Sequence, residues 1–555
     1  MKEERTLSLS IPRRTEGELS FSDGSVDDLA RWTDELPMNR PEEAAALLRD
    51  ALGELNRSEG GLTERFRQME ILRPVAHFVC SAFSPTRSRR GLLVDEKERA
   101  EAILAQSLQI ELATGYKIIV VDALREGVAL APGASPESPA GMALVAVHRT
   151  LTELAQTLLR SLQRYTPPPP RLWEQLHQLF LLAEMRGVLG ESVRDEEHQY
   201  RERSRIVDAY LRAVMLGAAR PNTLRPTMLG TLFNLLEDWT RFVDISTEEP
   251  EDGAHAVVDL SGDHPPVTAA MYDSHDGQEA RTIDSTRLLD VLNRHLDPEQ
   301  TQVSAGPALP EADQDDLVRH AVQAWGVVTK RVFKRMPVEG HLEICAGMLA
   351  LHYHIAGGVP FEEQLGGIVR RRGRTPARYR TFSLTLADAS PGGYGLICGG
   401  DFPDDLQTGD LLGVHKEGAE DWHIAVVRWF GNEPGGARVG IELLAPRAEP
   451  AGARAVSSRG GGKEWTPVLL LPEIRALHQP SALITPRGTF RLGQKLALNR
   501  GGRESKVRLE SSRSFTENFH QFALTEFDTD SGVPDTGIEV DYIAPDDDAM
   551  EQFHF

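Results

Sequence analysis

The spacing of apolar residues changes along this chain, and that change limits the folds it can adopt. As far as about Ile245, apolar residues recur at the spacing of amphipathic helices. From His341 onward the apolar runs are short and are separated by Gly, Asp and Pro, which is typical of antiparallel strands. At 555 residues the chain is also too long for one core. We therefore predict a multidomain α+β protein, with an all-α N-terminal multi-helix domain, a C-terminal antiparallel β-barrel and additional β-strands.

The helical region contains several helix starts and apolar stripes. Ser25 precedes a first turn that carries two Asp residues, and Pro41 is followed by Glu-Glu, as helix starts prefer. An apolar stripe runs from Leu172 to Ala183. Helices are also expected over Ser25–Trp32, Pro41–Leu55, Ile206–Leu216, Leu229–Phe242, Thr282–His295 and Ala312–Val328. No clean repeat period is present, so the pattern does not indicate a known repeat family.

The strand region divides into two sets. The first set is expected over His341–Ala346, Tyr379–Ala387, Tyr394–Cys398, Leu411–His415, His423–Trp429 and Arg438–Leu444. The second set is expected over Val468–Leu471, Ser481–Ile484, Lys495–Leu498 and Lys506–Leu509. A helix at Met348–Ile355 and a basic loop interrupt the first set, which indicates an insertion between its first two strands.

Domain boundaries follow from these changes in pattern. We expect an irregular N-terminal segment at 1–24, a helical domain at 25–250, a connecting strand and helices at 251–329, a β-barrel at 330–447 with an insertion at about 348–379, additional β-strands at 448–525 and an acidic tail at 526–555. The tail is expected because no Lys or Arg follows Arg513, whereas Asp and Glu are frequent there.

Composition argues against several classes of protein. A net charge of −22 argues against DNA or RNA binding, which needs a basic surface. Cys80, Cys345 and Cys398 show no spacing typical of a metal site or a disulfide framework, so we expect no metal, cofactor or disulfide. No apolar run is long enough to span a membrane, and the first residues lack the apolar core of a secretory signal. We therefore expect a cytoplasmic protein without membrane insertion.

Two short segments carry groups suited to a nucleotide. Lys330–Arg335 (KRVFKR) is strongly basic, and Asp388–Gly393 (DASPGG) is expected to form a turn between two strands. An Arg guanidinium can bind guanine O6 and N7, or two phosphate oxygens, in a bidentate way. Asp388 can accept hydrogen bonds from guanine N1–H and N2–H, and Ser390 adds a hydroxyl. The two glycines of the turn are expected to adopt positive φ and to leave room for a ligand.

In this order the two segments resemble the motifs of the PilZ domain. Arg331-x-x-x-Arg335 precedes the first strand and Asp388-x-Ser390-x-x-Gly393 ends the second, and the later strand ARVGIELLAP is similar to the family's closing strand. The resemblance covers residues 330–447 and implies a six-stranded PilZ-like barrel that binds cyclic di-GMP. It implies that the ligand is bound by Arg331, Arg335, Asp388, Ser390 and Gly393.

The spacing of the two motifs leaves an alternative open. Arg335 and Asp388 are 53 positions apart, which is more than the family's usual separation and requires the insertion. A second Arg pair with the same spacing, Arg374 and Arg378, lies only ten residues before Asp388. We favour Arg331 and Arg335, because the Phe and Pro around them fit the family's lead into a strand better. Lys330, Arg374 and Arg378 are possible additional contacts.

The resemblance implies a cyclic di-GMP receptor or adaptor and not an enzyme. By the same resemblance, the receptor would regulate motility, type IV pili, adhesion or biofilm formation through an unknown protein partner. One alternative is a degenerate PilZ scaffold whose helical domain binds a partner without nucleotide, and in that case Asp388 can simply cap its own turn. Another is an enzyme with its site in the helical domain, for which no catalytic motif is present in the sequence.

Overall fold

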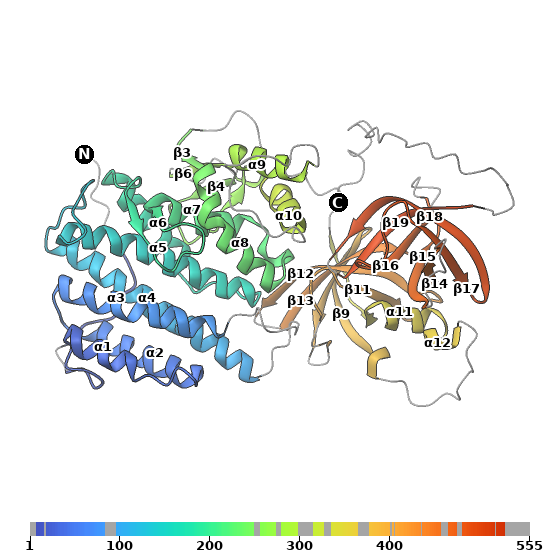
Figure 1. Cartoon of the computed structure of the whole chain (residues 1–555), viewed down its shortest axis with the longest axis horizontal. Helices are drawn as coiled ribbons and strands as arrows, with labels where there is room; N and C mark the ends of the chain where they lie inside the picture. Colours follow the sequence, from blue (N-terminus) through green and yellow to red (C-terminus); the bar gives the residue numbers. More distant parts are fainter. Residues whose placement is uncertain are drawn as a thin grey trace. The chain divides into compact units, whose positions relative to one another are not determined.

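The chain divides into two compact units in the computed structural model (Figure 1). One unit comprises residues 1–89 and 94–328, and the other comprises residues 90–93 and 329–555. The structure describes residues 7–15, 18–83, 96–248, 256–272, 279–297, 315–326, 335–364, 377–399, 402–403, 406–433, 436–456, 464–473, 480–516 and 518–527.

The first unit consists mainly of helices, and several begin at the residues that favour helix starts. The Ser25 hydroxyl accepts a hydrogen bond from the Asp28 amide at 3.3 Å, and the Ser138 hydroxyl accepts one from the Gly141 amide at 3.1 Å. The helices are α1 (Val26–Asp34), α2 (Pro41–Arg57), α3 (Leu62–Ser81), α4 (Glu96–Arg125), α5 (Pro139–Gln163), α6 (Leu172–Met185), α7 (Ile206–Ala218), α8 (Pro226–Trp239), α9 (Thr286–Leu296) and α10 (Asp315–Trp325). The helical character expected of the N-terminal region is confirmed, although three short strands within residues 192–246 depart from a purely α-helical fold.

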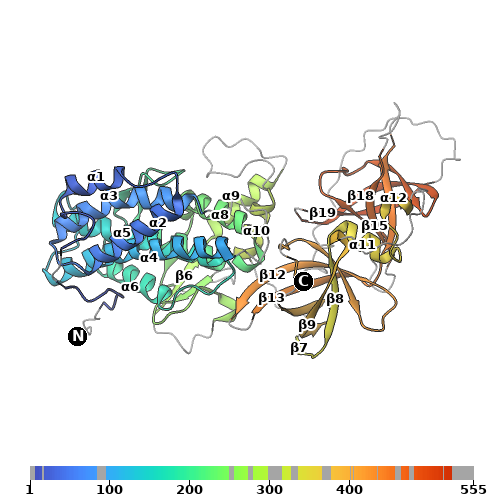
Figure 2. The same cartoon turned by 90° about the horizontal axis from the view of Figure 1, so that it is seen from below.

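The core of this unit is centred on α4 and α5, which pack along each other (Figures 1 and 2). Residues 141–155 of α5 are buried at nearly every position. On α4, Tyr116 and Ile119 are fully buried. Residues 112–120 of α4 and most of α5 are covered on all sides and have no polar stripe, and this explains why the apolar spacing did not single out these helices.

A small sheet follows the helices. Its strands are β3 (Asp244–Ser246), β4 (Ala256–Asp259), β5 (Val267–Thr268) and β6 (Ala280–Asp284), in the order β3-β6-β4-β5. The helix expected from Thr282 was wrong at its start, because residues up to Asp284 pair as a strand and α9 begins at Thr286. Helices α9 and α10 share the core of the helical unit, where the Trp325 ring meets the edge of Trp239 with centroids 6.0 Å apart.

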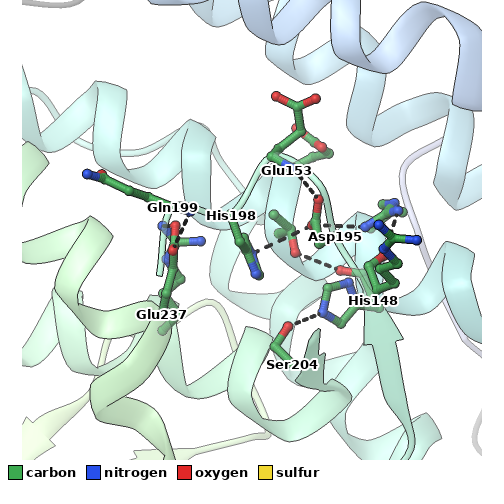
Figure 3. A network of polar contacts seen from close by, with 12 residues as sticks. His148, Glu153, Asp195, His198, Gln199, Ser204 and Glu237 are labelled. Atoms are coloured by element: carbon green, nitrogen blue, oxygen red, sulfur yellow. Dashed lines mark hydrogen bonds and ion pairs between the residues drawn. The ribbon is translucent and has the colours of Figure 1, made fainter. Parts of the chain in front are cut away.

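A buried polar network fixes the loop between two short strands, β1 (Ser192–Arg194) and β2 (Arg203–Arg205), to the helices (Figure 3). Asp195 accepts hydrogen bonds from Arg73 at 2.8 and 3.0 Å and pairs with Arg149 at 2.8 Å. Glu153 on α5 pairs with Arg73 at 2.7 Å and with His77 at 2.9 Å. Burial alone would raise the pKa of Glu153, but the charges of His77 and Arg73 lower it to about 2.

The second unit begins with a barrel whose strands follow the predicted ones closely. They are β7 (Met336–Pro337), β8 (His341–Ala346), β9 (Thr381–Ser390), β10 (Gly393–Cys398), β11 (Leu411–Lys416), β12 (His423–Glu433) and β13 (Gly436–Ala445). The sheet order is β10-β13-β12-β11-β8-β9-β7, and pairing of β10 with β9 closes it into a ring. Tyr379 lies before β9 in a 3₁₀ turn, and β9 continues to Ser390.

Two helices lie between β8 and β9, where the insertion is expected. They are α11 (Met348–Ile355) and α12 (Phe361–Gln364), and the bounds of α11 agree with the predicted helix. Leu351 of α11 packs in one apolar cluster with Leu469 and Ile484 of the following strands. Figure 2 shows α11 where the two sets of strands meet.

The strands after residue 448 form a second closed barrel. They are β14 (Glu449–Ala455), β15 (Thr466–Leu471), β16 (Ala482–Pro486), β17 (Lys495–Arg500), β18 (Arg503–Phe515) and β19 (Phe519–Glu526), in the order β14-β15-β16-β19-β18-β17. The sequence did not reveal β14, since EPAGARA has little strand propensity, nor β19. Residues of the expected acidic tail from 528 onward lie outside the described residues.

The structure shows the state of the three cysteines and the length and polarity of the described helices. Cys80, Cys345 and Cys398 are free and buried. Burial raises the pKa of the Cys345 and Cys398 thiols to about 12. Within the described ranges, none of the helices has the length and apolar character to cross a bilayer.

Candidate functional site

Four residues form one row across the outer face of the first barrel. Asp388 on β9 faces Gly395 on β10, Gly395 faces Gly440 on β13, and Gly440 faces Trp429 on β12. Leu396, the neighbour of Gly395, is fully buried, so the row points to the opposite, outer side. Side chains of directly paired residues share a face, which brings Asp388 and Trp429 to the two ends of a glycine floor.

Both glycines are required by the side chains beside them. A Cβ at Gly395 would lie 2.7 Å from the Asp388 carboxylate oxygens. A Cβ at Gly440 would overlap the indole nitrogen of Trp429, because the indole lies across the backbone of this glycine. The result is a flat patch of backbone, with a carboxylate over one glycine and an aromatic ring over the other.

Two guanidinium groups reach the carboxylate. Arg335 Nη1 donates to Asp388 Oδ1 at 2.8 Å, and Arg438 Nη2 donates to Asp388 Oδ2 at 3.4 Å. The Arg335 guanidinium carbon also lies 5.8 Å from the centre of the Trp429 ring. The three charged side chains keep exposures of 18–30%, so the cluster is open to solvent. Its net charge is +1, which suits an anionic ligand.

Strand pairing explains how Arg335 reaches a residue so far along the chain. Pro337 of β7 pairs with Asp388 of β9, and Met336 pairs with Ala389. Arg335 directly precedes β7, and this pairing therefore places it next to the Asp388 carboxylate. The described residues between them include β7, β8, the inserted helices and most of β9, and these elements account for much of the large separation between the two motifs.

The hairpin after Asp388 differs from the expected turn in two ways. Asp388 lies inside β9 rather than in the turn, because β10 pairs with β9 as far as Ser390. The positive φ expected for Gly392 and Gly393 was wrong, since neither residue adopts it. A Cβ at Gly393 would instead overlap the carbonyl oxygen of Ile441, so this glycine permits close approach of β13. The Ser390 hydroxyl donates to the Gly393 carbonyl at 3.3 Å, across the hairpin.

Of the remaining sequence candidates, only Arg378 is described, and it does not join this cluster. Lys330, Arg331 and Arg374 lie outside the residues that the structure describes. Arg378 is described, and its guanidinium carbon lies 4.6 Å from the ring centre of Tyr379. Arg378 precedes the first residue of β9, whereas Asp388 lies near the last. The stretch of β9 from Thr381 to Asp388 is about 23 Å long.

Sequence reasoning missed Trp429, Arg438 and the two floor glycines. The signal was available in the strand ARVGIELL, where Val439 and Ile441 are buried, so Arg438 and Gly440 must face outward. For Trp429 the alternation was misleading, because β12 shifts register between Val427 and Trp429.

A Ser–His pair in the helical unit is a core contact. His148 Nε2 and the Ser204 hydroxyl are 2.7 Å apart, and both side chains are buried (Figure 3). Burial lowers the pKa of His148 well below its ordinary value. In the described part of the chain, no group of three or more His, Cys, Asp or Glu residues is placed to hold a metal ion.

Three family models match successive parts of the chain. "Cyclic-di-GMP receptor FimW, N-terminal domain" matches residues 27–251, "Cyclic-di-GMP receptor FimW, middle PilZ domain" matches 256–372 and 369–450, and "FimW C-terminal beta-barrel domain" matches 451–527. The "Cyclic-di-GMP receptor FimW" of Pseudomonas aeruginosa is 32% identical over 573 residues, covering 93% of each chain. The chain belongs to the FimW family. The resemblance to PilZ domains is thereby confirmed, and the Pseudomonas FimW is described as a cyclic di-GMP receptor.

The FimW models also bear on the parts outside the PilZ barrel. The C-terminal FimW model describes a β-barrel, in agreement with the closed ring of β14 to β19. The middle FimW model begins at residue 256, so its range includes β4, β6, α9 and α10. No solved structure matches the chain significantly.

Proposed function

We propose that this chain is a receptor, not an enzyme, that binds cyclic di-GMP on the outer face of its first barrel. The observation that carries the proposal is the contact of Arg335 with Asp388 beside the floor of Gly395 and Gly440. Membership of the FimW family supports it, since the Pseudomonas FimW is described as a cyclic di-GMP receptor.

In the proposed complex, one guanine lies over the glycine floor and stacks against Trp429. The Asp388 carboxylate accepts hydrogen bonds from N1–H and N2–H of that guanine. Arg335 and Arg438 donate either to O6 and N7 of the guanine or to the two phosphates, each of which carries a negative charge. Because Asp388 is already bonded to these guanidinium groups, ligand binding must redirect at least one of them toward the ligand.

The sequence candidates have distinct places in this proposal. Arg331 is proposed to bind the ligand with Arg335, and Lys330 is proposed to add positive charge from the same segment. Ser390 and Gly393 hold the hairpin in the geometry that keeps β10 close to β13. Arg374 and Arg378 are not proposed as primary ligand contacts, because β9 separates Arg378 from Asp388.

The regulated process is also proposed from the PilZ resemblance. The receptor acts in the cytoplasm on motility, type IV pili, adhesion or biofilm formation, through a protein partner that contacts the helical unit. The net charge of −22 supports a protein partner rather than DNA or RNA. A barrel that has lost its ligand would keep the Arg335–Asp388 ion pair as a structural contact, and this is the competing function.

Calorimetric titration of the full chain with cyclic di-GMP tests the proposal. We expect a dissociation constant in the micromolar range or below, about −8 kcal/mol or better. Cyclic di-AMP is the matched control, because adenine lacks the N1–H and N2–H donors that Asp388 would accept. Absence of heat and of any rise in melting temperature at about 100 μM cyclic di-GMP would support the scaffold instead.

A further inference from the structure

Four cations gather on the outer face of the second barrel, away from the Asp388 site. Lys495 on β17 pairs with Arg508 on β18, and one row further Arg454 on β14 and Lys506 on β18 both face Ala497. Their neighbours along the strands are buried inside the barrel, so these side chains point outward. We call Arg454, Lys495, Lys506 and Arg508 the cationic face.

Negative charge compensates the cationic face only in part, because Glu504 and Glu510 lie two positions from Lys506 and Arg508 along β18. Arg454 pairs with Glu504 at 3.2 Å. For Lys495, Lys506 and Arg508, no carboxylate partner exists among the residues whose structure is described. Residues 449–527 carry twelve Lys and Arg against seven Asp and Glu, a net charge of +5 in a chain whose total is −22. The surface therefore attracts an anionic partner.

The chain itself supplies such a partner next to this face. Residues 528–555 contain nine Asp and Glu and no Lys or Arg, a net charge of −9. They follow directly on Phe527, whose amide donates to the Lys506 carbonyl at 3.0 Å. The Lys495 ammonium lies 5.8 Å from the Phe527 ring centre. The acidic segment thus leaves the barrel at the edge of the cationic face.

We propose that the acidic segment 528–555 docks on the cationic face of its own barrel. A segment tethered at Phe527 has an effective concentration in the millimolar range or above, so modest attraction keeps it bound. Unpaired opposite charges within a Debye length of about 8–10 Å attract each other at physiological ionic strength. The docked segment shields the cations from other anionic molecules, and this role is independent of cyclic di-GMP binding.

Lysine acetylation followed by mass spectrometry tests the proposal in the full chain. The comparison variant has all nine carboxylates of 528–555 replaced by the corresponding amides. At low salt we expect Lys495 and Lys506 to react several-fold more slowly in the unmodified chain than in the variant. The difference should vanish at about 0.5 M NaCl, where screening is nearly complete. Lys416 in the first barrel is the internal control and should react alike in both proteins.

Equal reactivity of Lys495 and Lys506 in the two proteins at low salt would overturn the proposal. A second variant changes the cationic face and leaves the acidic segment as it is: it carries Lys495→Gln, Lys506→Gln and Arg508→Gln. Because these side chains lie on the barrel surface, the melting temperature should be unchanged. Cleavage of the acidic segment by a glutamate-specific protease should become several-fold faster. An unchanged cleavage rate, or protection that depends on protein concentration, would exclude docking within one molecule.

Discussion

Asp388 lies in a strand and faces two guanidinium groups, and this position determines how its carboxylate can act. Both oxygens point at cations rather than at the backbone of a turn, so the carboxylate does not cap its own chain. Ion pairs of this exposure contribute about 0–1 kcal/mol to stability. Arg335 and Arg438 therefore hold the carboxylate in place, and under the proposed function exchanging one of them for a ligand costs little stability.

Asp388→Asn is expected to weaken cyclic di-GMP binding about 10- to 100-fold, or about 1–3 kcal/mol. The amide removes the negative charge and sets a donor against guanine N1–H. The unfolding free energy should change by no more than about 1 kcal/mol. Calorimetry and thermal unfolding measure the two quantities, with Arg378→Ala as the control that should leave affinity unchanged. Unchanged affinity with a lowered melting temperature would contradict the ligand role.

Gly440→Ala is expected to disturb the floor of the site. The added methyl overlaps the Trp429 indole, which must move, and we expect a loss of about 1–3 kcal/mol of stability. Affinity for cyclic di-GMP should fall and the tryptophan fluorescence should shift. Gly392→Ala is the matched control, because its Cβ meets nothing within 4 Å and its φ is not positive. Similar effects of the two variants would argue against a specific role for the floor.

Sequence patterns located two of the four side chains that form this site and neither of its two floor glycines. The motif residues Arg335 and Asp388 could be named because their order along the chain resembles a known family. Trp429 and Arg438 could not, since their contribution depends on strand register, and a bulge in β12 changes which face Trp429 occupies. Pairing of Pro337 with Asp388 is likewise a property of the folded sheet rather than of either segment.

At the scale of elements, the loop between β1 and β2 depends on buried charge. Asp195 and Glu153 are compensated by arginines, and His198 lies beside Asp195 at 3.6 Å. Burial, reinforced by the charge of Arg212, lowers the pKa of His198 to about 4. Burial also raises the pKa of an isolated carboxylate, but the neighbouring cations hold the pKa of Asp195 well below its ordinary range.

These shifts predict that acid destabilises the helical unit. The folded pKa of His198 lies below its ordinary 6.5, so its contribution is fully present above pH 6.5 and is lost as pH falls toward about 4. The lowered pKa of Glu153 has the same effect at lower pH: its contribution to stability is lost as pH falls from its ordinary pKa of 4.5 toward about 2. From pH 7 to pH 5 the His198 contribution amounts to about 2 kcal/mol.

Urea unfolding, followed by the helical circular dichroism signal at pH 7 and pH 5, measures this loss. His198→Gln should reduce the pH dependence by about 2 kcal/mol, whereas the exposed His264→Gln should leave it unchanged. Identical pH dependence in the unmodified chain and His198→Gln would show that His198 does not carry the effect.

Element types were more predictable than element contacts. The predicted strand His341–Ala346 and helix Met348–Ile355 agree with β8 and α11, since apolar runs of that length between glycines have few alternatives. Strand β14 was missed because its Ala, Gly and Pro residues obtain their structure from pairing with β15 and β17. Closure of the second barrel could not be predicted without β14 and β19.

At the scale of the whole molecule, residues 327–334 join α10 directly to Arg335. Helix α10 is held in the helical core by Trp325, whose indole N–H donates to the Met215 carbonyl at 3.2 Å. If cyclic di-GMP holds Arg335 as proposed, it fixes a residue that lies only ten positions after Trp325 in the chain. This continuity of the chain provides a route by which the site can act on the helical unit.

Cyclic di-GMP is expected to slow amide hydrogen exchange in α10 as well as around Asp388. A coupling of about 1–3 kcal/mol would change exchange rates about 5- to 150-fold. Exchange with and without ligand, resolved by peptide mass spectrometry, measures the effect. Protection confined to β9, β10 and β13 would mean that the barrel binds its ligand without influencing the helices.

The burial of Cys80, Cys345 and Cys398 leaves the protein without an accessible thiolate near neutral pH. A maleimide or a thiol-reactive nitroxide would therefore leave the three native cysteines unmodified and react with a cysteine introduced on the surface. Pairs of such labels, one in each unit, can report distances by fluorescence transfer or electron spin resonance. The separation of the helical and β-rich parts in solution, with and without nucleotide, thus becomes measurable without replacing any native cysteine.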